Sequence, residues 1–163
     1  MSRRSTLICL PALIVALWAS SASAQTPPTP YGAPIGLEAA TKAAAAAVAE
    51  ARKNNWAMVV AVTDAAGDLV YLEKMDGVGT GSVVLAQGKA RSAAIFKRPT
   101  KVWQDILAGG GDGLRLLTLP GVVTAEGGLP LIVDGKIVGA IGLGGGSPAQ
   151  DGQCAKAGAD AVK

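Results

Sequence analysis

Residues 129–143 read LPLIVDGKIVGAIGL and decide the fold. Two apolar, β-branched runs flank the pair Asp134-Gly135. This pair is favoured in two-residue type I′ turns because both central positions need a positive φ. The stretch predicts a β-hairpin with strands at residues 129–133 and 136–143, and it is the strongest local signal in the chain.

A second hairpin is predicted upstream. Residues 58–63 and 69–75 are short apolar runs, and residues 64–68 (DAAGD) between them have turn residues at both ends. Strands joined by tight turns pair antiparallel, and their apolar character requires cover on more than one face. We expect one or two further strands within residues 114–126.

Helical segments flank these hairpins. Residues 37–53 are rich in alanine and place apolar positions on one stripe. A helix from residues 81–82 ends before Pro99, and Thr100 can cap a short continuation through Leu107. Ser147, Pro148 and Gln150 have the spacing of a capping box with proline at the first helical position. The expected fold is α+β: a central antiparallel β-sheet flanked by α-helices in a single compact domain, residues 37–163.

The first 24 residues have the order of a secretory signal peptide. Arg3 and Arg4 precede an apolar run at residues 7–18, and small residues at 22–24 (ASA) offer cleavage after Ala24. The run is shorter than the roughly 20 residues of a membrane span, so no stable membrane anchor is expected. Residues 25–36 read as a mobile, proline-rich linker. The mature protein is expected to be periplasmic or secreted.

Composition excludes several classes of function. The chain has no histidine, which rules out a Ser-His-Asp triad, a histidine base and a proximal histidine for haem within one chain. Cleavage would leave Cys154 alone, so no internal disulfide can form. It would also reduce 15 basic residues to 13 against 12 acidic ones, a net charge of +1. Nothing in this pattern indicates nucleic acid.

Glycine and alanine are concentrated in two places. Residues 142–146 (GLGGG) lie before a helix. Their free backbone N–H groups could hold an anion, or the glycines could allow the unusual backbone angles of a strand exit. The small residues of segment 86–94 allow another backbone, or a flat ligand, to approach closely. Lys89 and Phe96 lie two turns apart there and could face one ligand, or Lys89 could be solvated. Glu126 and Asp64 are the candidate carboxylate bases.

Several segments together resemble the haem-degrading (GlcG/HbpS-like) domain family. They are residues 60–70 (VAVTDAAGDLV), 74–77 (KMDG), 88–94 (GKARSAA), Phe96, 99–100 (PT), 127–130 (GGLP) and 139–142 (GAIG), continuing to the region of Asp151. The resemblance spans roughly residues 37–163. It implies an antiparallel αβ domain assembled into dimers or octamers that binds haem or another tetrapyrrole.

The resemblance suggests a ligand pocket in this chain formed by Met75, Lys89, Phe96, Thr100, Gly127 and Gly128. Without histidine, iron ligation would fall to Tyr31, Met58, Tyr71, Met75, a deprotonated lysine or Cys154, or to a solvent or partner group. The resulting hypothesis is an exported, homo-oligomeric binding protein for haem or a related flat cofactor, active in haem sensing or scavenging.

Two other classes remain open. Some members of the family occur beside glycolate or diol metabolism, which suggests an enzyme or binding module for a small carboxylate or aromatic acid. In that case Lys89 would hold the anion and Glu126 or Asp64 would move a proton. The third class is a purely structural assembly module. Assembly itself is expected because small-residue helices in a short chain without disulfides leave apolar surface to cover; the alternative is that these faces pack within one subunit.

Overall fold

The computed structural model describes residues 28–163, so the predicted signal peptide lies outside the described residues. The elements, in chain order, are α1 (Leu37–Lys53), β1 (Val59–Asp64), β2 (Leu69–Lys74), α2 (Gly81–Ile95), α3 (Thr100–Ala108), the 3₁₀ helix η1 (Gly111–Thr118), β3 (Gly128–Val133), β4 (Lys136–Gly144) and α4 (Pro148–Asp160).

Both predicted hairpins are confirmed. The four strands form one sheet in the order β2-β1-β4-β3, and every neighbouring pair is antiparallel. Asp134 and Gly135 have φ angles of 49° and 72°, as a type I′ turn requires. Ser147 and Gln150 form the predicted capping box at the start of α4.

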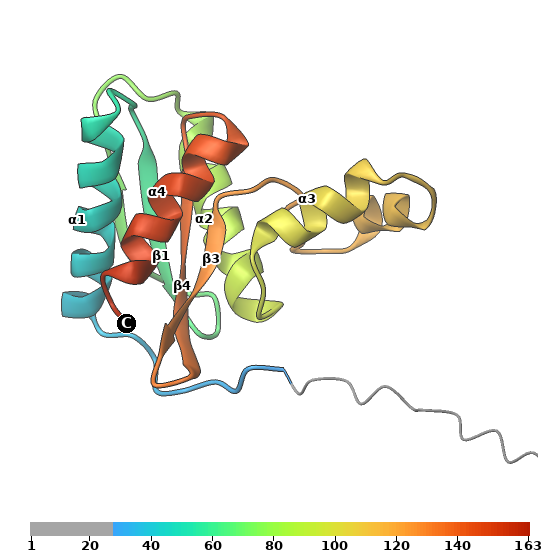
Figure 1. Ribbon diagram of the computed structural model, residues 1–163, viewed down its shortest axis with the longest axis horizontal. Coiled ribbons are helices and arrows are strands. Elements are labelled where there is room, and N and C mark those ends of the chain that lie inside the picture. The colour runs from blue at the N-terminus through green and yellow to red at the C-terminus, as the bar shows by residue number, and fades with distance from the viewer. Residues whose placement is uncertain (1–27) are drawn as a thin grey trace, which may run out of the picture.

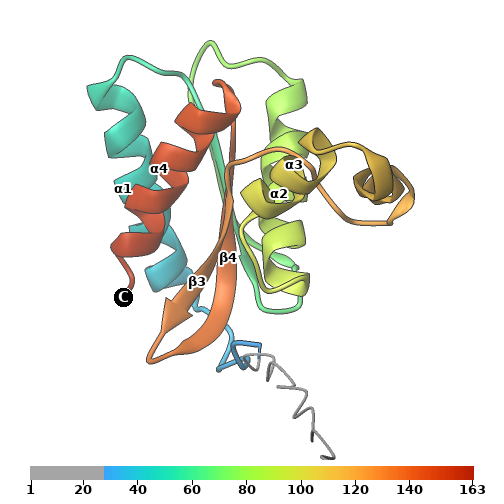
Figure 2. The ribbon, with the colours of Figure 1, turned by 45° about the vertical axis from the view of Figure 1, so that its right-hand side comes forward.

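Helices cover both faces of the sheet, which gives the predicted α+β architecture three layers (Figure 2). α1 and α4 pack together on one face, and α2 lies on the other. Side chains of β1 alternate accordingly: Val60 and Val62 belong to the core beneath α1 and α4, whereas Val59 and Ala61 pack against α2.

The small residues of α2 serve backbone packing. A Cβ on Gly142 of β4 would overlap the carbonyl oxygen of Ala86, so the helix lies directly on the strand. The alanine stripe of α1 is likewise fully buried within the subunit. The expectation that these faces need a partner subunit is therefore wrong, and the within-subunit alternative holds for them.

Part of the predicted linker belongs to the domain. Gly32 and Ile35 donate backbone hydrogen bonds to Ile137 and Val138 of β4 at 2.8 Å each, and Ile137 donates to Pro30 at 2.9 Å. The Ile35 side chain is buried in the core. Residues 30–35 are thus held against the start of β4, and the expected mobile linker is wrong for this portion.

No strand forms within residues 114–126, contrary to expectation. Gly110 and Gly111 adopt positive φ angles of 65° and 54° and turn the chain after α3 into η1. α3 and η1 pack against each other, with Gly113 seated on the Ile106 carbonyl. Residues 100–120, called the arm below, project from the body of the domain (Figure 1). Between residues 28 and 163, no helix is both long and apolar enough to cross a membrane.

The contact between Gly142 and α2 gives a stability prediction. Gly142→Ala should lower the free energy of unfolding by about 3 kcal/mol, because either the helix or the strand must shift to admit the methyl group. Gly81→Ala is the matched control, since an added Cβ there meets nothing within 4 Å; it should be neutral or stabilising by about 0.5 kcal/mol. Chemical denaturation measures both. Equal stability of the two variants would contradict the packing described.

Candidate functional site

A buried ion pair connects α2 with α4. The Nζ atom of Lys89 lies 2.6 Å from Oδ2 of Asp151, and each side chain is only 1% exposed. The other carboxylate oxygen, Oδ1, accepts a hydrogen bond from the backbone N–H of Gly146 at 3.1 Å. Lys89 is therefore not a solvated lysine, and its charge is already neutralised.

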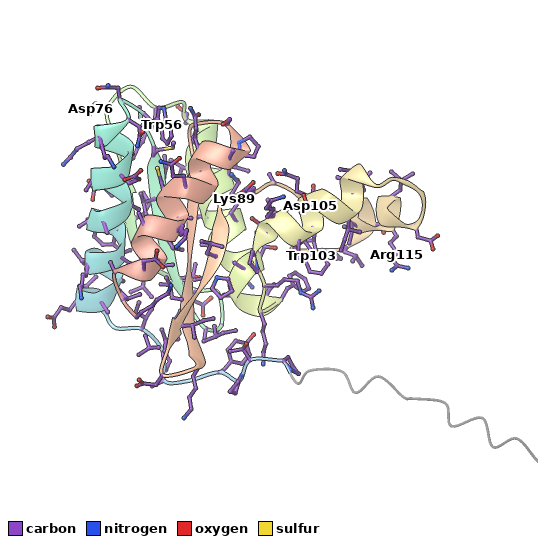
Figure 3. The ribbon with its side chains drawn as sticks, viewed as in Figure 1. Trp56, Asp76, Lys89, Trp103, Asp105 and Arg115 are labelled. Atoms are coloured by element: carbon purple, nitrogen blue, oxygen red, sulfur yellow. The ribbon has the colours of Figure 1, made fainter. Side chains whose placement is uncertain are left out.

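Four of the six predicted pocket residues meet around this pair. Gly127 adopts φ +121°, and an added Cβ there would lie 2.6 Å from Cβ of Asp151 and 2.9 Å from Nζ of Lys89. The N–H of Gly128 donates to Oγ1 of Thr100 at 2.9 Å. Thr100 thus anchors β3 and does not cap α3, whose N-cap is Pro99. Figure 3 shows Lys89 between the helix layers.

A groove of about 540 Å³ lies on the outer side of this cluster. Residues adjacent in sequence to the buried cluster form its wall: Pro99, Glu126, Leu129 and Gly152. Leu129, Pro130 and Ile132 make its surface apolar, while charged side chains mark its rim. The remaining lining residues are Thr29, Lys97, Ile137, Lys156, Ala159, Asp160 and Lys163. We call this the α4–β3 groove.

Phe96 borders a second hollow, of about 610 Å³, which shares Thr29 and Lys97 with the α4–β3 groove. Its ring packs edge-on against Trp103, with ring centroids 5.6 Å apart, and Arg98 lies over the other ring at 4.7 Å. Lys97 has a positive φ of 56°, and its Nζ lies 4.0 Å above the ring of Tyr31. Phe96 is therefore next to the groove and not inside it.

Met75 lies apart from the other five residues. It follows β2, and its Sδ atom accepts a hydrogen bond from the N–H of Met58 at 3.4 Å. The hollow it lines is formed by Arg52, Glu73, Lys74 and Asp76. Figure 3 places Asp76 at the end of the domain away from Lys89.

The two candidate carboxylate bases have different environments. Oδ1 of Asp64 accepts the N–H groups of Ala66 and Asp68 at 2.9 Å each, so this carboxylate stabilises the hairpin turn. Glu126 lies at the wall of the groove, where its side chain packs on Gly152. Of the two, Glu126 alone borders the groove.

The glycine-rich segment before α4 is a strand exit. Gly145 has φ +138°. The N–H groups of Gly146 and Ser147 are taken by the side chains of Asp151 and Gln150, at 3.1 and 2.8 Å. The N–H of Gln150, in the first turn of α4, donates to the Ser147 hydroxyl at 3.4 Å. These three donors at the start of α4 are thus satisfied within the chain and are not available to an external anion.

The side chains that could ligate iron are occupied or buried. Met58 and Cys154 are fully buried, and burial raises the pKa of the Cys154 thiol to about 11, which disfavours the thiolate. Burial and the neighbouring Glu73 raise the pKa of Tyr71. The Tyr31 hydroxyl donates to the carbonyl of Ala94 at 2.9 Å. No cysteine, methionine or tyrosine lines the α4–β3 groove, and residues 28–163 contain no cluster of three metal-ligating side chains.

Haem therefore fits the groove in part. The apolar wall and the lysines suit a flat ring carrying carboxylates, whereas the described lining residues supply no soft or aromatic axial ligand for iron. Asp151 was missed as a site residue because its partner is 62 positions away in the sequence. The available signal was Lys89 itself: a lysine on the alanine face of a helix, once buried, requires an acidic partner.

The ion pair gives the next prediction. Lys89→Met should destabilise the protein by about 3–5 kcal/mol, because it leaves the Asp151 carboxylate buried without its counter-charge. Lys89→Met with Asp151→Asn should recover more than half of this loss, since asparagine keeps an acceptor for Gly146. Lys101→Met, which breaks an exposed pair with Asp105, should cost about 0.5 kcal/mol or less. Denaturant titration of all three provides the measurement, and similar losses for Lys89→Met and Lys101→Met would refute the role given to burial.

Comparison with known proteins places these features in a family. Residues 35–160 match the family model described as haem degrading protein HbpS-like. Protein GlcG of Escherichia coli K12 is 40% identical over 109 residues, which cover 67% of this chain and 80% of GlcG.

Solved structures agree in fold. A double mutant of Streptomyces reticuli HbpS has a TM-score of 0.73 at 34% identity, covering 94% of this chain and 99% of that one. PduOC, solved as a complex with heme, has a TM-score of 0.72 at 30% identity, covering 80% and 96%. The chain belongs to the HbpS-like haem-degrading protein family.

Proposed function

We propose that this chain is an exported, dimer-based homo-oligomeric protein that binds haem or a related tetrapyrrole in the α4–β3 groove, for haem sensing or scavenging. The observation that carries the proposal is the groove itself. It has an apolar wall, lysines at its rim and a volume of about 540 Å³, within the range of small-molecule sites. Membership of the HbpS-like family and the heme complex of PduOC support the ligand class.

The lysines at the rim suit a ligand with carboxylates. Lys156 and Lys163 both contact Asp160 and are 70% and 65% exposed. An incoming carboxylate can share these flexible cations with Asp160 at little cost, because exposed ion pairs contribute little stability. Leu129 and Pro130 lie beside them and offer contact to a flat apolar ring.

The ring and its carboxylates, more than the metal, would then determine affinity. None of the described groove residues is a histidine, cysteine, methionine or tyrosine. A solvent molecule or a group from a partner subunit would complete any iron coordination. This distinguishes the proposed site from haem sites built on a proximal side-chain ligand.

Export completes the proposal. The signal-peptide pattern of residues 1–24 predicts a mature protein in the periplasm or outside the cell, where it could meet haem before uptake.

One observation favours the second candidate, an enzyme or binding module for a small organic acid. Glu126 and three lysines line the same groove, so a carboxylate could bind near a potential base. Lys89 does not hold the anion in this version, because Asp151 already neutralises it. Thermal shift with hemin and with small carboxylates separates the two. Stabilisation by a small acid and not by hemin would replace the leading proposal.

The role of the ring gives a direct test. Metal-free protoporphyrin IX should bind the mature protein within about tenfold of hemin, a difference of about 1.4 kcal/mol or less, because no histidine, cysteine, methionine or tyrosine is among the described residues that line the groove. Lys156→Glu with Lys163→Glu should weaken both ligands by about tenfold or more through charge repulsion. Lys42→Glu with Lys53→Glu on α1 is the control of equal charge change and should leave binding unaltered. Absorbance and fluorescence titrations report the dissociation constants.

Two results would contradict the proposal. Saturable hemin binding with no binding of protoporphyrin IX would show that iron ligation dominates. Equal weakening by the α4 and α1 charge changes would show that binding is a general charge effect and does not occur in the groove.

A further inference from the structure

A buried hydroxyl without a hydrogen-bond partner borders a hollow on the α2 face of the domain. Among the buried side-chain nitrogen and oxygen atoms of the described residues, Oγ1 of Thr63 and Nε1 of Trp103 have no partner. Thr63, on β1, is 2% exposed. A buried hydroxyl left unpaired costs free energy, which a bound molecule that supplies the hydrogen bond would recover. The hydroxyl of Thr63 therefore marks the hollow beside it as a candidate binding site.

The hollow lies between β1, the β1–β2 turn and α2, and Thr63 faces it. In the antiparallel pairing of β1 with β4, Thr63 lies opposite Ala140, whose side chain packs against Ala93 and Ala94 of α2. Residues directly opposite each other in a sheet share a face, so the Thr63 side chain also points toward α2. The hollow has a volume of about 370 Å³. We call it the β1–α2 hollow; it is lined by Thr63, Gly67, Asp68, Leu69, Val84, Gln87, Gly88 and Arg91.

The rim of the β1–α2 hollow has one cation and one anion side by side. Nη1 of Arg91 donates to the carbonyl of Gly67 at 3.1 Å and lies 3.7 Å from Oδ1 of Asp68. The stem of Arg91 packs on Gly67, where an added Cβ would lie 2.9 Å from Cγ of the arginine. The turn thus holds the guanidinium in place. The Arg91 and Asp68 side chains are 53% and 79% exposed, so their ion pair is weak and both groups are free to take another partner.

Apolar surface and an amide complete the lining. Leu69 of β2 and Val84 of α2 are 51% and 76% exposed, and they offer contact to an apolar group. Gln87 lies one turn after Val84 on the same face of α2 and is half-buried. Its amide can both donate and accept a hydrogen bond. The hollow therefore combines opposite charges, neutral polar groups and apolar contact within a small volume.

We infer that the β1–α2 hollow binds a free α-amino acid with an apolar side chain. The carboxylate of the amino acid pairs with Arg91 and its ammonium pairs with Asp68. The hydroxyl of Thr63 donates to the carboxylate, and the apolar side chain lies against Leu69 and Val84. A simple acid is repelled by the aspartate and a simple amine by the arginine, whereas an α-amino acid carries both charges on groups bonded to one carbon.

This site is separate from the α4–β3 groove. The two share no lining residue, and they lie on the α2 side and the α4 side of the sheet. The inference therefore goes beyond the proposed function and does not depend on it.

Calorimetric titration of the mature protein with free leucine tests the inference. The wild type should bind leucine saturably, and about tenfold or more tightly than isovalerate, which lacks the ammonium, or isoamylamine, which lacks the carboxylate. Arg91→Met and Asp68→Asn should each weaken leucine binding about tenfold or more, because each removes one charge of the pair. Arg52→Met, at an exposed arginine on α1, is the matched control and should leave binding unchanged. Circular dichroism verifies that each variant is folded.

Thr63→Val separates a role in binding from a role in folding. The substitution removes an unpartnered hydroxyl at nearly constant shape, so it should raise the denaturation midpoint and yet weaken leucine binding about fivefold or more. Thr41→Val is the matched control on α1, where the hydroxyl donates to the carbonyl of Leu37 at 2.8 Å, and it should leave leucine binding unchanged. A change of stability in Thr63→Val with unaltered leucine affinity would overturn the inference.

Failure of this inference and failure of the proposed function are distinguishable. A protein that binds hemin and protoporphyrin IX but shows no saturable leucine binding would overturn the inference and leave the groove proposal intact. So would leucine binding that Arg91→Met and Asp68→Asn leave unchanged. A protein that binds neither tetrapyrrole, but whose leucine binding is weakened by Arg91→Met and not by Lys156→Glu with Lys163→Glu, would uphold the β1–α2 hollow and overturn the proposed ligand of the groove.

Discussion

Lys89 of α2 reaches Asp151 of α4, and the two charges are stable in the interior only while they remain in contact. The helices that carry them lie on opposite faces of the sheet. The pair therefore fixes the relative position of the two outer layers at one end of the domain. The ion pair also requires glycine at position 127, because the space beside Nζ of Lys89 and Cβ of Asp151 admits no side chain. Gly128, held by the Thr100 hydroxyl, continues the same close packing.

The buried cluster determines the shape of the α4–β3 groove that lies above it. Glu126 and Leu129 flank the two glycines, Gly152 follows Asp151, and Pro99 precedes Thr100; all four line the α4–β3 groove. The charged cluster itself stays buried and does not contact the groove as a free cation. Its role is to position the wall, and Lys89 and Thr100 support the groove without lining it. Affinity would then come from the apolar wall and the rim lysines.

Local sequence signals predicted most of the fold, because the decisive features act over a few residues. The Asp134-Gly135 turn and the capping box at Ser147 are set by backbone angles and neighbouring donors. The region of residues 114–126 was predicted wrongly because its leucines satisfy either a strand or a 3₁₀ turn. The positive φ angles of Gly110 and Gly111 turn the chain into the 3₁₀ helix, and glycine permits these angles without requiring them. Asp151 could not be assigned, because nothing local shows which acidic side chain meets a lysine 62 positions away.

The base of the arm and the wall of the groove are built from the same few residues. α3 begins at Thr100, and its hydroxyl holds Gly128, the first residue of β3. Gln104, one turn further along α3, holds the N–H of Glu126 in the groove wall. A rotation of the arm would therefore move Glu126 and Gly128 together, and with them the wall of the α4–β3 groove.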